Sequence, residues 1–181
     1  QVDGLATANG GFRVSAGHKT LACDYLALAA GGHSTRLAAT MGVKLPLWVD
    51  CNMLTVTEPG PRVIDKVLTH IGGTMSLKQH SNGTVLIGGG WQGRGKFSQQ
   101  TREIDPVAWV QNVGLGASIV PGLRGLRVNR AWAGYEAVTK DALPMLGRMP
   151  GIENAFVAAG ARGGFHMGPA QGFVLSELIL E

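Results

Sequence analysis

The chain has 181 residues, of which 45% are hydrophobic and 15% charged, so it can bury the core of one large domain or of parts of two. Its net charge of +4 is mild, and no run of basic residues is interleaved with aromatics, which argues against nucleic-acid binding. Its 28 glycines are well above the usual share of roughly 7% and indicate many tight turns and close backbone approaches.

The chain shows no sequence sign of a metal-binding or membrane-spanning protein. Cys23 and Cys51 form no CxxC pair and build no zinc motif with the scattered histidines, so no metal site is expected. Unpaired cysteines are typical of a reduced, cytoplasmic protein. No apolar run approaches the roughly 18 residues that a membrane span requires. The chain starts as though inside a strand and stops inside a helical pattern, so we expect a piece of a longer protein.

The sequence pattern of the first part of the chain is typical of an α/β domain. Residues 12–15 and 20–23 flank a turn at Gly17, which predicts a hairpin. Residues 25–30 form a continuous apolar run, typical of a strand buried on both faces of a parallel sheet. This strand ends at Gly31, and Ser34 is a suitable N-cap for a short helix over 35–41.

The middle of the chain predicts an antiparallel sheet covered by a helix. Asn82-Gly83 is a strong hairpin signal between two expected strands, and Asp105-Pro106 opens an expected helix that ends near residue 119. The expected strands cover residues 53–57, 74–79, 84–88 and 127–134. This block separates two α/β segments, so the layout is an α/β domain with an inserted α+β module.

The end of the chain carries the most informative segment. An apolar run over 155–159 predicts a buried strand, and an apolar-periodic run over 173–179 predicts a helix. Between them lies a glycine-rich turn, and Pro169 occupies a position suited to the first turn of the helix. A helix N-terminus after such a turn suits an anionic or electron-rich ligand, although an ordinary strand-to-helix corner would show the same pattern.

A series of short motifs is spaced across nearly the whole chain. They occupy residues 28–37, 45–47, 56–59, 83–89, 132–134, 141–147 and 160–172. Their order resembles that of FAD-dependent oxidoreductases of the D-amino-acid oxidase family. Within that family, Gly163-Gly164-Phe165-His166 is most similar to the sarcosine oxidase beta subunit and to D-hydroxyproline dehydrogenase-like proteins.

The resemblance implies a fold and a division into domains. The fold is the α/β FAD-binding portion (Rossmann-like, glutathione-reductase type) with an inserted α+β antiparallel-sheet substrate domain. The implied boundaries are 1–47 for the first part of the FAD-binding domain, 48–141 for the substrate-binding domain and 142–181 for the remaining FAD-binding part. The G-x-G-x-x-G fingerprint does not occur in this chain, so the resemblance covers the C-terminal half and lacks the N-terminal βαβ unit.

The resemblance also implies FAD as the cofactor and assigns residues to it. Ala30 and Gly31 close the strand that passes beneath the cofactor, and the backbone of the glycine loop points N–H groups at the flavin pyrimidine edge. Such donors stabilise the negative charge that collects there on reduction. The implied cofactor residues are Ala30, Gly31, Gly147, Gly160, Gly163, Gly164, Phe165, His166 and Met167.

An amino-acid substrate requires a cation for its carboxylate. The Arg-Gly-Gln common in the family is replaced by Cys51-Asn52-Met53, and the arginine that often follows Trp-x-Gly is replaced by Tyr135-Glu136-Ala137. His166 and Arg162 on the glycine loop are therefore the candidate cations. The implied substrate residues are Tyr135, Glu136, Arg162 and His166. No catalytic acid or base is assigned.

The function expected from the resemblance is oxidation of the C–N bond of an amino or imino acid by hydride transfer to FAD. The substrate would be a D-amino acid, a proline derivative or a sarcosine-like compound. The electron acceptor would be oxygen or a partner subunit or quinone, in a hetero-oligomer. One alternative is an assembly or electron-transfer subunit of a flavin oxidoreductase complex, and another is a flavin-fold protein that binds a ligand without catalysis.

Overall fold

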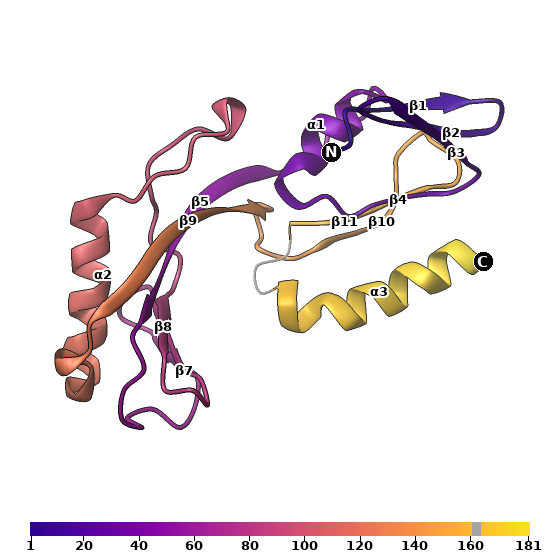
Figure 1. Ribbon diagram of the computed structural model, residues 1–181. Helices are drawn as coiled ribbons and strands as arrows, with labels where there is room; N and C mark the ends of the chain where they lie inside the picture. Colours follow the sequence, from indigo (N-terminus) through magenta and orange to yellow (C-terminus); the bar gives the residue numbers. More distant parts are fainter. Residues whose placement is uncertain (161–163) are drawn as a thin grey trace. The chain divides into compact units, whose positions relative to one another are not determined.

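The computed structural model describes residues 1–160 and 164–181 (Figure 1). The described chain divides into two compact units, the first made of residues 1–49 and 136–181 and the second of residues 50–135. The strands β5 (Trp48–Thr57) and β9 (Val128–Val138) run through the two points of division. A mixture of sheets and helices is therefore present, with one unit inserted in the sequence of the other.

The strands of the first unit form two three-stranded sheets. In one, β1 (Gly4–Ala8), β2 (Gly11–Ala16) and β3 (Lys19–Cys23) pair antiparallel in chain order. In the other, β11 (Ala155–Ala159) lies between the antiparallel β10 (Met145–Arg148) and the parallel β4 (Leu26–Leu28). The helices of this unit are η1 (Gly31–His33), α1 (Ser34–Ala39) and α3 (Gly164–Leu180).

The core of the first unit joins both sheets to helix α1. Leu5 and Phe12 from the first sheet, Leu28 and Val157 from the second, and Leu37 from α1 are all buried in one apolar cluster. Burying such side chains contributes about 1.5–3 kcal/mol each and gives the unit its own core.

Three local expectations for the first unit are wrong. Ser34 is the first residue of α1 rather than its N-cap, and no side chain among the described residues caps this helix. The apolar run over 25–30 forms only the short strand β4, in which Leu26 and Leu28 are buried but Ala27 is exposed, because β4 is an edge strand of its sheet. Helix α3 begins at Gly164, so Pro169 lies inside the helix rather than in its first turn. Pro169 cannot donate to the Phe165 carbonyl and its ring crowds that carbonyl, yet the helix continues past it to Leu180.

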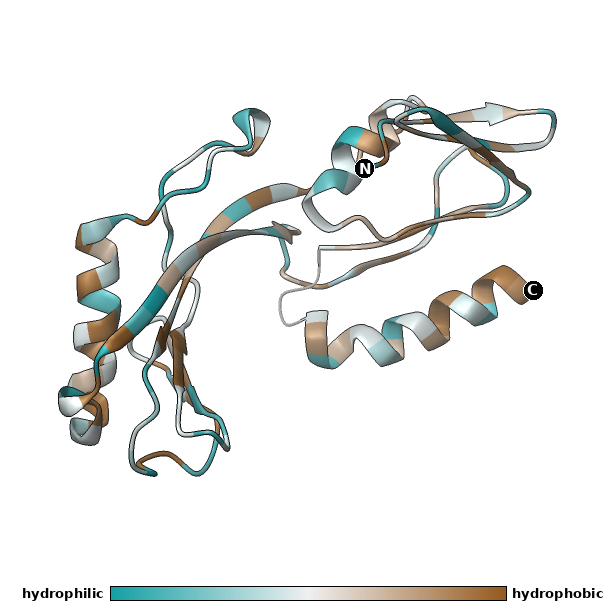
Figure 2. Cartoon of the chain, in the orientation of Figure 1, coloured by the Kyte–Doolittle hydropathy of each residue, from teal (hydrophilic) through white to brown (hydrophobic). Residues whose placement is uncertain are grey.

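Helix α3 contacts β10 and β11 through one stripe of side chains. Met167, Gln171 and Leu175 are half-buried on this stripe, and the Arg148 guanidinium donates a hydrogen bond of 3.0 Å to the Leu178 carbonyl near the helix C-terminus. Figure 2 shows that apolar residues continue along α3 outside the stripe, and Leu180 is 86% exposed. The helix is therefore amphipathic only in part.

The second unit is an antiparallel sheet with one covering helix. Its strand order is β6-β7-β8-β5-β9, where β6 is Leu68–His70, β7 is Met75–Gln79 and β8 is Val85–Gly88. The predicted hairpin at Asn82-Gly83 is confirmed, since β7 pairs antiparallel with β8. Helix α2 (Pro106–Ile119) lies between the short helices η2 (Phe97–Gln99) and η3 (Pro121–Gly125) in the sequence.

Helix α2 covers the face of this sheet to which the odd-numbered residues of β5 point. Its start is confirmed at Asp105-Pro106, where the Asp105 carboxylate caps the helix by accepting hydrogen bonds from the Val107 and Ala108 N–H groups. The Trp109 indole donates to the Thr55 hydroxyl at 2.8 Å, and the Asn112 amide donates to the Gly88 carbonyl at 3.1 Å. These polar contacts fix the position of α2 on the sheet.

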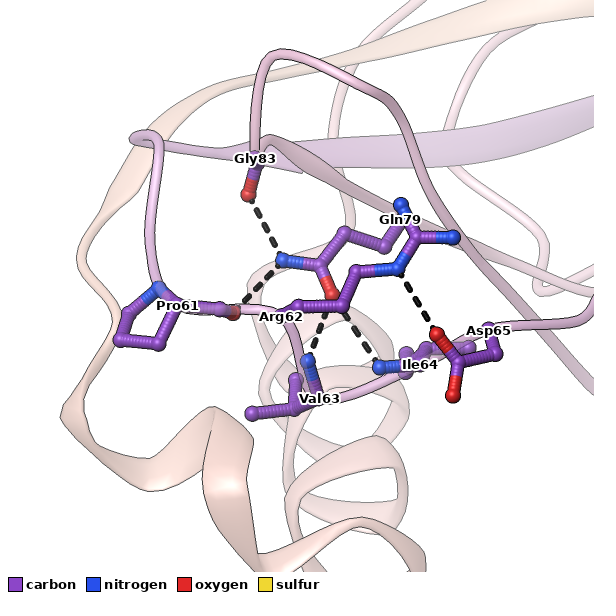
Figure 3. A network of polar contacts seen from close by, with 7 residues as sticks. All are labelled: Pro61, Arg62, Val63, Ile64, Asp65, Gln79 and Gly83. Atoms are coloured by element: carbon purple, nitrogen blue, oxygen red, sulfur yellow. Dashed lines mark hydrogen bonds and ion pairs between the residues drawn. The ribbon is translucent and has the colours of Figure 1, made fainter.

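Gln79, which is 6% exposed at the end of β7, holds a loop of the second unit in place (Figure 3). Its amide oxygen accepts hydrogen bonds from the Val63 and Ile64 N–H groups at 2.8 and 3.1 Å. Its amide nitrogen donates to the carbonyls of Pro61 and Gly83 at 2.8 and 3.0 Å. One side chain thus satisfies four backbone groups.

We expect Gln79→Ala to destabilise the protein by about 2–3 kcal/mol, because it leaves buried backbone donors and acceptors without partners. Urea unfolding of the full chain measures this loss. Gln99→Ala, on an exposed glutamine of η2, is the control and should change the free energy of unfolding by less than about 0.5 kcal/mol. Equal stability of the two variants would contradict the role given to the Gln79 amide.

Candidate cofactor and substrate site

Two strands of the first unit end at the same edge of a sheet. Because β4 and β11 are parallel, with Leu26 opposite Ala155 and Leu28 opposite Val157, their carboxyl ends lie together. Gly31 follows the first of these ends and Gly160 the second, and η1 packs against β11. In open α/β sheets, ligands bind outside the carboxyl ends of the parallel strands, so this edge is the candidate cofactor site.

The glycines at this site differ in what surrounds them. Gly31 (φ +55°) and Gly147 (φ +154°) face open space, since a Cβ built on either would meet no atom within 4 Å. At Gly160 (φ +77°), a Cβ would lie 2.7 Å from both the Leu47 and Thr139 side chains. Gly160 is therefore required by packing within the chain, whereas Gly31 and Gly147 leave room for a group to approach the backbone.

Helix α3 presents its N-terminus after Gly160. Gly164, Phe165, His166 and Met167 form its first turn, whose N–H groups have no carbonyl partners within the helix. Phe165 is 99% exposed and His166 is exposed, so both side chains are accessible in the described chain. The predicted site residues Arg162 and Gly163 lie outside the residues that the structure describes.

A cavity of about 590 Å³ adjoins this region in the first unit. It is mainly apolar and is lined by Pro46, Thr139, Lys140, Asp141, Leu143, Pro144 and Met145. Thr139 also packs against Gly160, and Met145 pairs with Ala159 at the end of β11. The open glycines leave room beside the backbone and the helix N-terminus favours negative charge, both of which suit FAD.

The Asp141 carboxylate at this cavity is part of a turn. It accepts a hydrogen bond of 3.1 Å from the Leu143 N–H, while the Thr139 hydroxyl donates to the Leu143 carbonyl at 2.6 Å. The hydrogen bond from the Leu143 N–H holds the pKa of Asp141 below its usual value. Asp141 is therefore an ionised turn residue at neutral pH and is not suited to donate a proton.

The predicted substrate residue Tyr135 is engaged within the second unit. Its hydroxyl donates to the Thr101 carbonyl at 2.7 Å and lies 3.3 Å from the Lys96 carbonyl. The Phe97 ring meets the Tyr135 ring edge-on at 4.9 Å, and the Arg102 guanidinium carbon lies 5.2 Å from the centre of the same ring. Tyr135 thereby anchors the loop over residues 96–102.

Glu136 follows Tyr135 on β9 and belongs to the first unit. Successive side chains of a strand point to opposite faces, so Glu136 points away from the loop that Tyr135 anchors. Tyr135 and Glu136 therefore point to opposite faces of β9.

Arg102 is a residue of this region that the sequence analysis missed. It lies near Cys51, where its positive charge favours the thiolate, although burial dominates and raises the pKa of the Cys51 thiol. Nothing in the local sequence distinguishes Arg102 from the other exposed arginines. Only its approach to both Cys51 and Tyr135, which are far apart in the chain, singles it out.

Among the described residues, no three His, Cys, Asp or Glu side chains are grouped closely enough to hold a metal ion. None of the helices in the same part of the chain is long and apolar enough to cross a membrane.

Comparison with known proteins gives a consistent result. The family described as DAO, FAD dependent oxidoreductase, matches residues 1–178. The sarcosine oxidase subunit beta of Rhizobium meliloti (strain 1021) is 32% identical over 184 residues, which cover 99% of this chain and 42% of that protein. The chain thus spans less than half the length of this relative.

Solved structures show the same fold. The glycine oxidase from Geobacillus kaustophilus superposes with a TM-score of 0.88 at 23% identity, over 99% of this chain and 47% of that one. The L-proline dehydrogenase from P. horikoshii also gives a TM-score of 0.88, at 25% identity, over 99% of this chain and 49% of that one.

Proposed function

We propose that the whole protein oxidises the C–N bond of an amino or imino acid, because the chain belongs to the FAD dependent oxidoreductase family. The observation that carries the proposal is the edge of the first unit. There, the parallel strands β4 and β11 end together, Gly31 and Gly160 follow these ends, Gly147 faces open space on the neighbouring β10, and α3 follows β11 in the sequence. This chain would form the flavin end of the cofactor site.

The residues proposed to hold FAD contribute mainly through their backbone. Ala30, Gly31 and Gly147 leave space for the ring system, and Gly160 directs the chain into the glycine loop. The N–H groups at the start of α3 favour negative charge, because they are unpaired within the helix and lie at its positive end. Gly163, Gly164, Phe165, His166 and Met167 complete the proposed cofactor residues.

FAD, when bound, supplies the hydride acceptor. The hydride would leave the substrate carbon that bears the amine, the nitrogen would lose a proton, and water would hydrolyse the resulting imine. Tyr135, Glu136, Arg162 and His166 are the proposed substrate residues. Since the Tyr135 hydroxyl already donates to a loop carbonyl, Tyr135 would act through the loop that it anchors.

Names of the relatives suggest the substrate class and the assembly. They include a sarcosine oxidase subunit, a glycine oxidase and an L-proline dehydrogenase, so small amino and imino acids are the proposed substrates. The word subunit in the first of these names supports a hetero-oligomer, with oxygen or a partner subunit or quinone as the electron acceptor. A cytoplasmic location is part of the same proposal.

The test uses the full-length protein that contains this chain. It is mixed anaerobically with sarcosine, glycine, L-proline and a set of D-amino acids, and the visible flavin absorbance is followed. We expect at least one of these compounds to bleach the flavin band. A protein that purifies with FAD but is reduced by none of them would contradict the proposed reaction and favour the non-catalytic alternative.

A further inference from the structure

Helix α3 is held on its sheet by few contacts. It meets β10 and β11 through a stripe of half-buried side chains, and none of the described residues of α3 is fully buried. Gln171 lies on this stripe, yet its amide nitrogen is buried and finds no hydrogen-bond partner among the described residues. A buried donor without a partner costs stability rather than adding to it. The position of α3 on the sheet therefore depends strongly on any polar contact that is satisfied.

Arg148 on β10 makes such a contact. Its guanidinium donates a hydrogen bond of 3.0 Å to the Leu178 carbonyl of α3. A hydrogen bond from a charged donor is roughly twice as strong as one between neutral groups. Arg148 thus connects the sheet to the helix at a point that is far along α3 from Gly164, where the helix begins.

The Arg148 side chain is itself held in place. Its guanidinium carbon lies 5.0 Å from the centre of the ring of Phe156, which is its cross-strand neighbour on β11 and is 0% exposed. The strand pairing continues past Arg148, because the Met149 N–H donates to the Ala155 carbonyl at 2.7 Å. Paired backbone and a buried ring therefore orient the guanidinium before it bonds to α3. A side chain ordered in this way loses little freedom when it holds the helix.

Arg148 also joins two elements that carry proposed cofactor residues. Gly147, which faces open space, precedes it on β10, and the first turn of α3 runs from Gly164 to Met167. A helix moves nearly as a rigid rod, so a shift at Leu178 changes the tilt of the first turn about 21 Å away. Over this distance the charge of Arg148 is screened, because the Debye length is about 8 Å at physiological ionic strength. Arg148 can therefore influence the cofactor site through the position of α3 rather than through its own charge.

We propose that Arg148 is a positioning residue, which sets the placement of α3 against β10 and β11 and thereby the direction of the N–H groups at the proposed flavin site. This inference rests on the proposed function and adds to it a residue that lies outside the site. The N–H groups at the start of α3 favour the negative charge of reduced flavin when they are directed at it. A displaced α3 should therefore bind the reduced cofactor less well, relative to the oxidised cofactor, than the wild-type helix does.

The experiment compares Arg148→Met and Arg148→Lys in the full-length protein. Methionine keeps an apolar side chain beside Phe156 but removes the donor, whereas lysine keeps a charged donor. For Arg148→Met we expect the Kd of reduced FAD to rise about threefold to tenfold more than that of oxidised FAD. This difference lowers the midpoint potential of the bound flavin by about 15–30 mV. Arg148→Lys should recover part of the shift.

Hydrogen exchange gives a second measurement, which does not require bound cofactor. The backbone amides of α3 should exchange faster in Arg148→Met than in the wild type, in the apoprotein as well as with FAD bound, because local opening becomes easier when an anchor is lost. Arg148→Lys should again recover part of the protection.

Arg13→Met is the matched control, because Arg13 is an exposed arginine on β2, in the other sheet of the same unit. It removes the same charge and should leave the midpoint potential and the exchange of α3 unchanged. The potentials are also measured at ionic strengths of about 0.1 M and about 1 M, between which the Debye length falls from about 10 Å to about 3 Å. A shift caused by the position of α3 should persist at the higher ionic strength.

Three outcomes would overturn the inference. The first is a folded Arg148→Met protein with wild-type potential, whether or not the exchange of α3 changes. The second is an equal shift in Arg13→Met, and the third is a shift that disappears at high ionic strength. Melting temperature shows whether each variant is folded, and Arg148→Gln replaces Arg148→Met if the latter does not fold. If the wild-type protein binds no FAD, the proposed function fails instead, and exchange in the apoprotein still decides whether Arg148 fixes α3.

Discussion

Replacing Gly89 by alanine is expected to prevent the second unit from folding. Gly89 follows β8 directly and has a φ of +119°, which residues with a Cβ rarely adopt. A Cβ at this position would lie 2.5 Å from the Met75 backbone nitrogen and 2.6 Å from its carbonyl carbon. Since the obstacle is the backbone of β7, a paired strand, no side-chain rotation relieves it. We expect a loss of more than about 4 kcal/mol.

Gly114→Ala is the control for this substitution. Gly114 lies inside α2 with no atom within 4 Å of a built Cβ, so alanine should be accommodated and should favour the helix by about 0.5–1 kcal/mol. Soluble yield and thermal unfolding of the two full-length variants are compared. A Gly89→Ala variant that melts within a few degrees of wild type would show that the β7–β8 approach is looser than described.

Parts of the fold could be predicted because their signals are local. Asn82-Gly83 fixes the β7–β8 hairpin, since Gly83 adopts the positive φ of +87° that the tight turn needs. Asp105-Pro106 marks the start of α2. The aspartate side chain accepts hydrogen bonds from free N–H groups of the first turn, and the proline has no N–H group that would lack a partner there. Each signal acts over a few residues, so neither depends on the remainder of the molecule.

Other features depend on contacts between distant residues and could not be predicted. Helix α3, which contacts β10 and β11, begins at Gly164 and so extends before the boundary that Pro169 suggested. The role of Gln79 depends on the loop at Val63 and Ile64, and this glutamine belongs to no motif. Neither contact can be predicted from the residues next to it in the sequence.

In the candidate site, too, some features could be predicted from local sequence and others could not. Its glycines could be selected from sequence, because the resemblance places Gly31, Gly147 and Gly160 within ordered motifs. The sequence could not show that Gly160 is required by the Leu47 and Thr139 side chains while Gly31 faces open space. It also could not show that the Tyr135 hydroxyl is already bonded to a loop, or that Arg102 lies beside it.

Gly31→Leu is expected to remove FAD from the full-length protein. In the proposed site, Gly31 opens the short helix η1 just after β4, and a Cβ there would meet no protein atom within 4 Å. A leucine side chain would therefore enter space that the cofactor needs rather than space that the protein fills. We expect the flavin content of the purified variant to fall at least about tenfold, which corresponds to about 1.4 kcal/mol or more of binding free energy.

A leucine at Gly31 also strains the backbone, and this effect must be separated from the loss of cofactor space. Gly17 provides the control, because it lies in the β2–β3 turn with a φ of +58°, against +55° for Gly31, and also has no atom within 4 Å of a built Cβ. Gly31→Leu and Gly17→Leu should therefore lose similar stability, while only Gly31→Leu loses flavin. Flavin absorbance measures the cofactor content of both variants, and thermal melting measures their stability. If both retain a full complement of FAD, or both lose it equally, Gly31 does not lie beneath the cofactor.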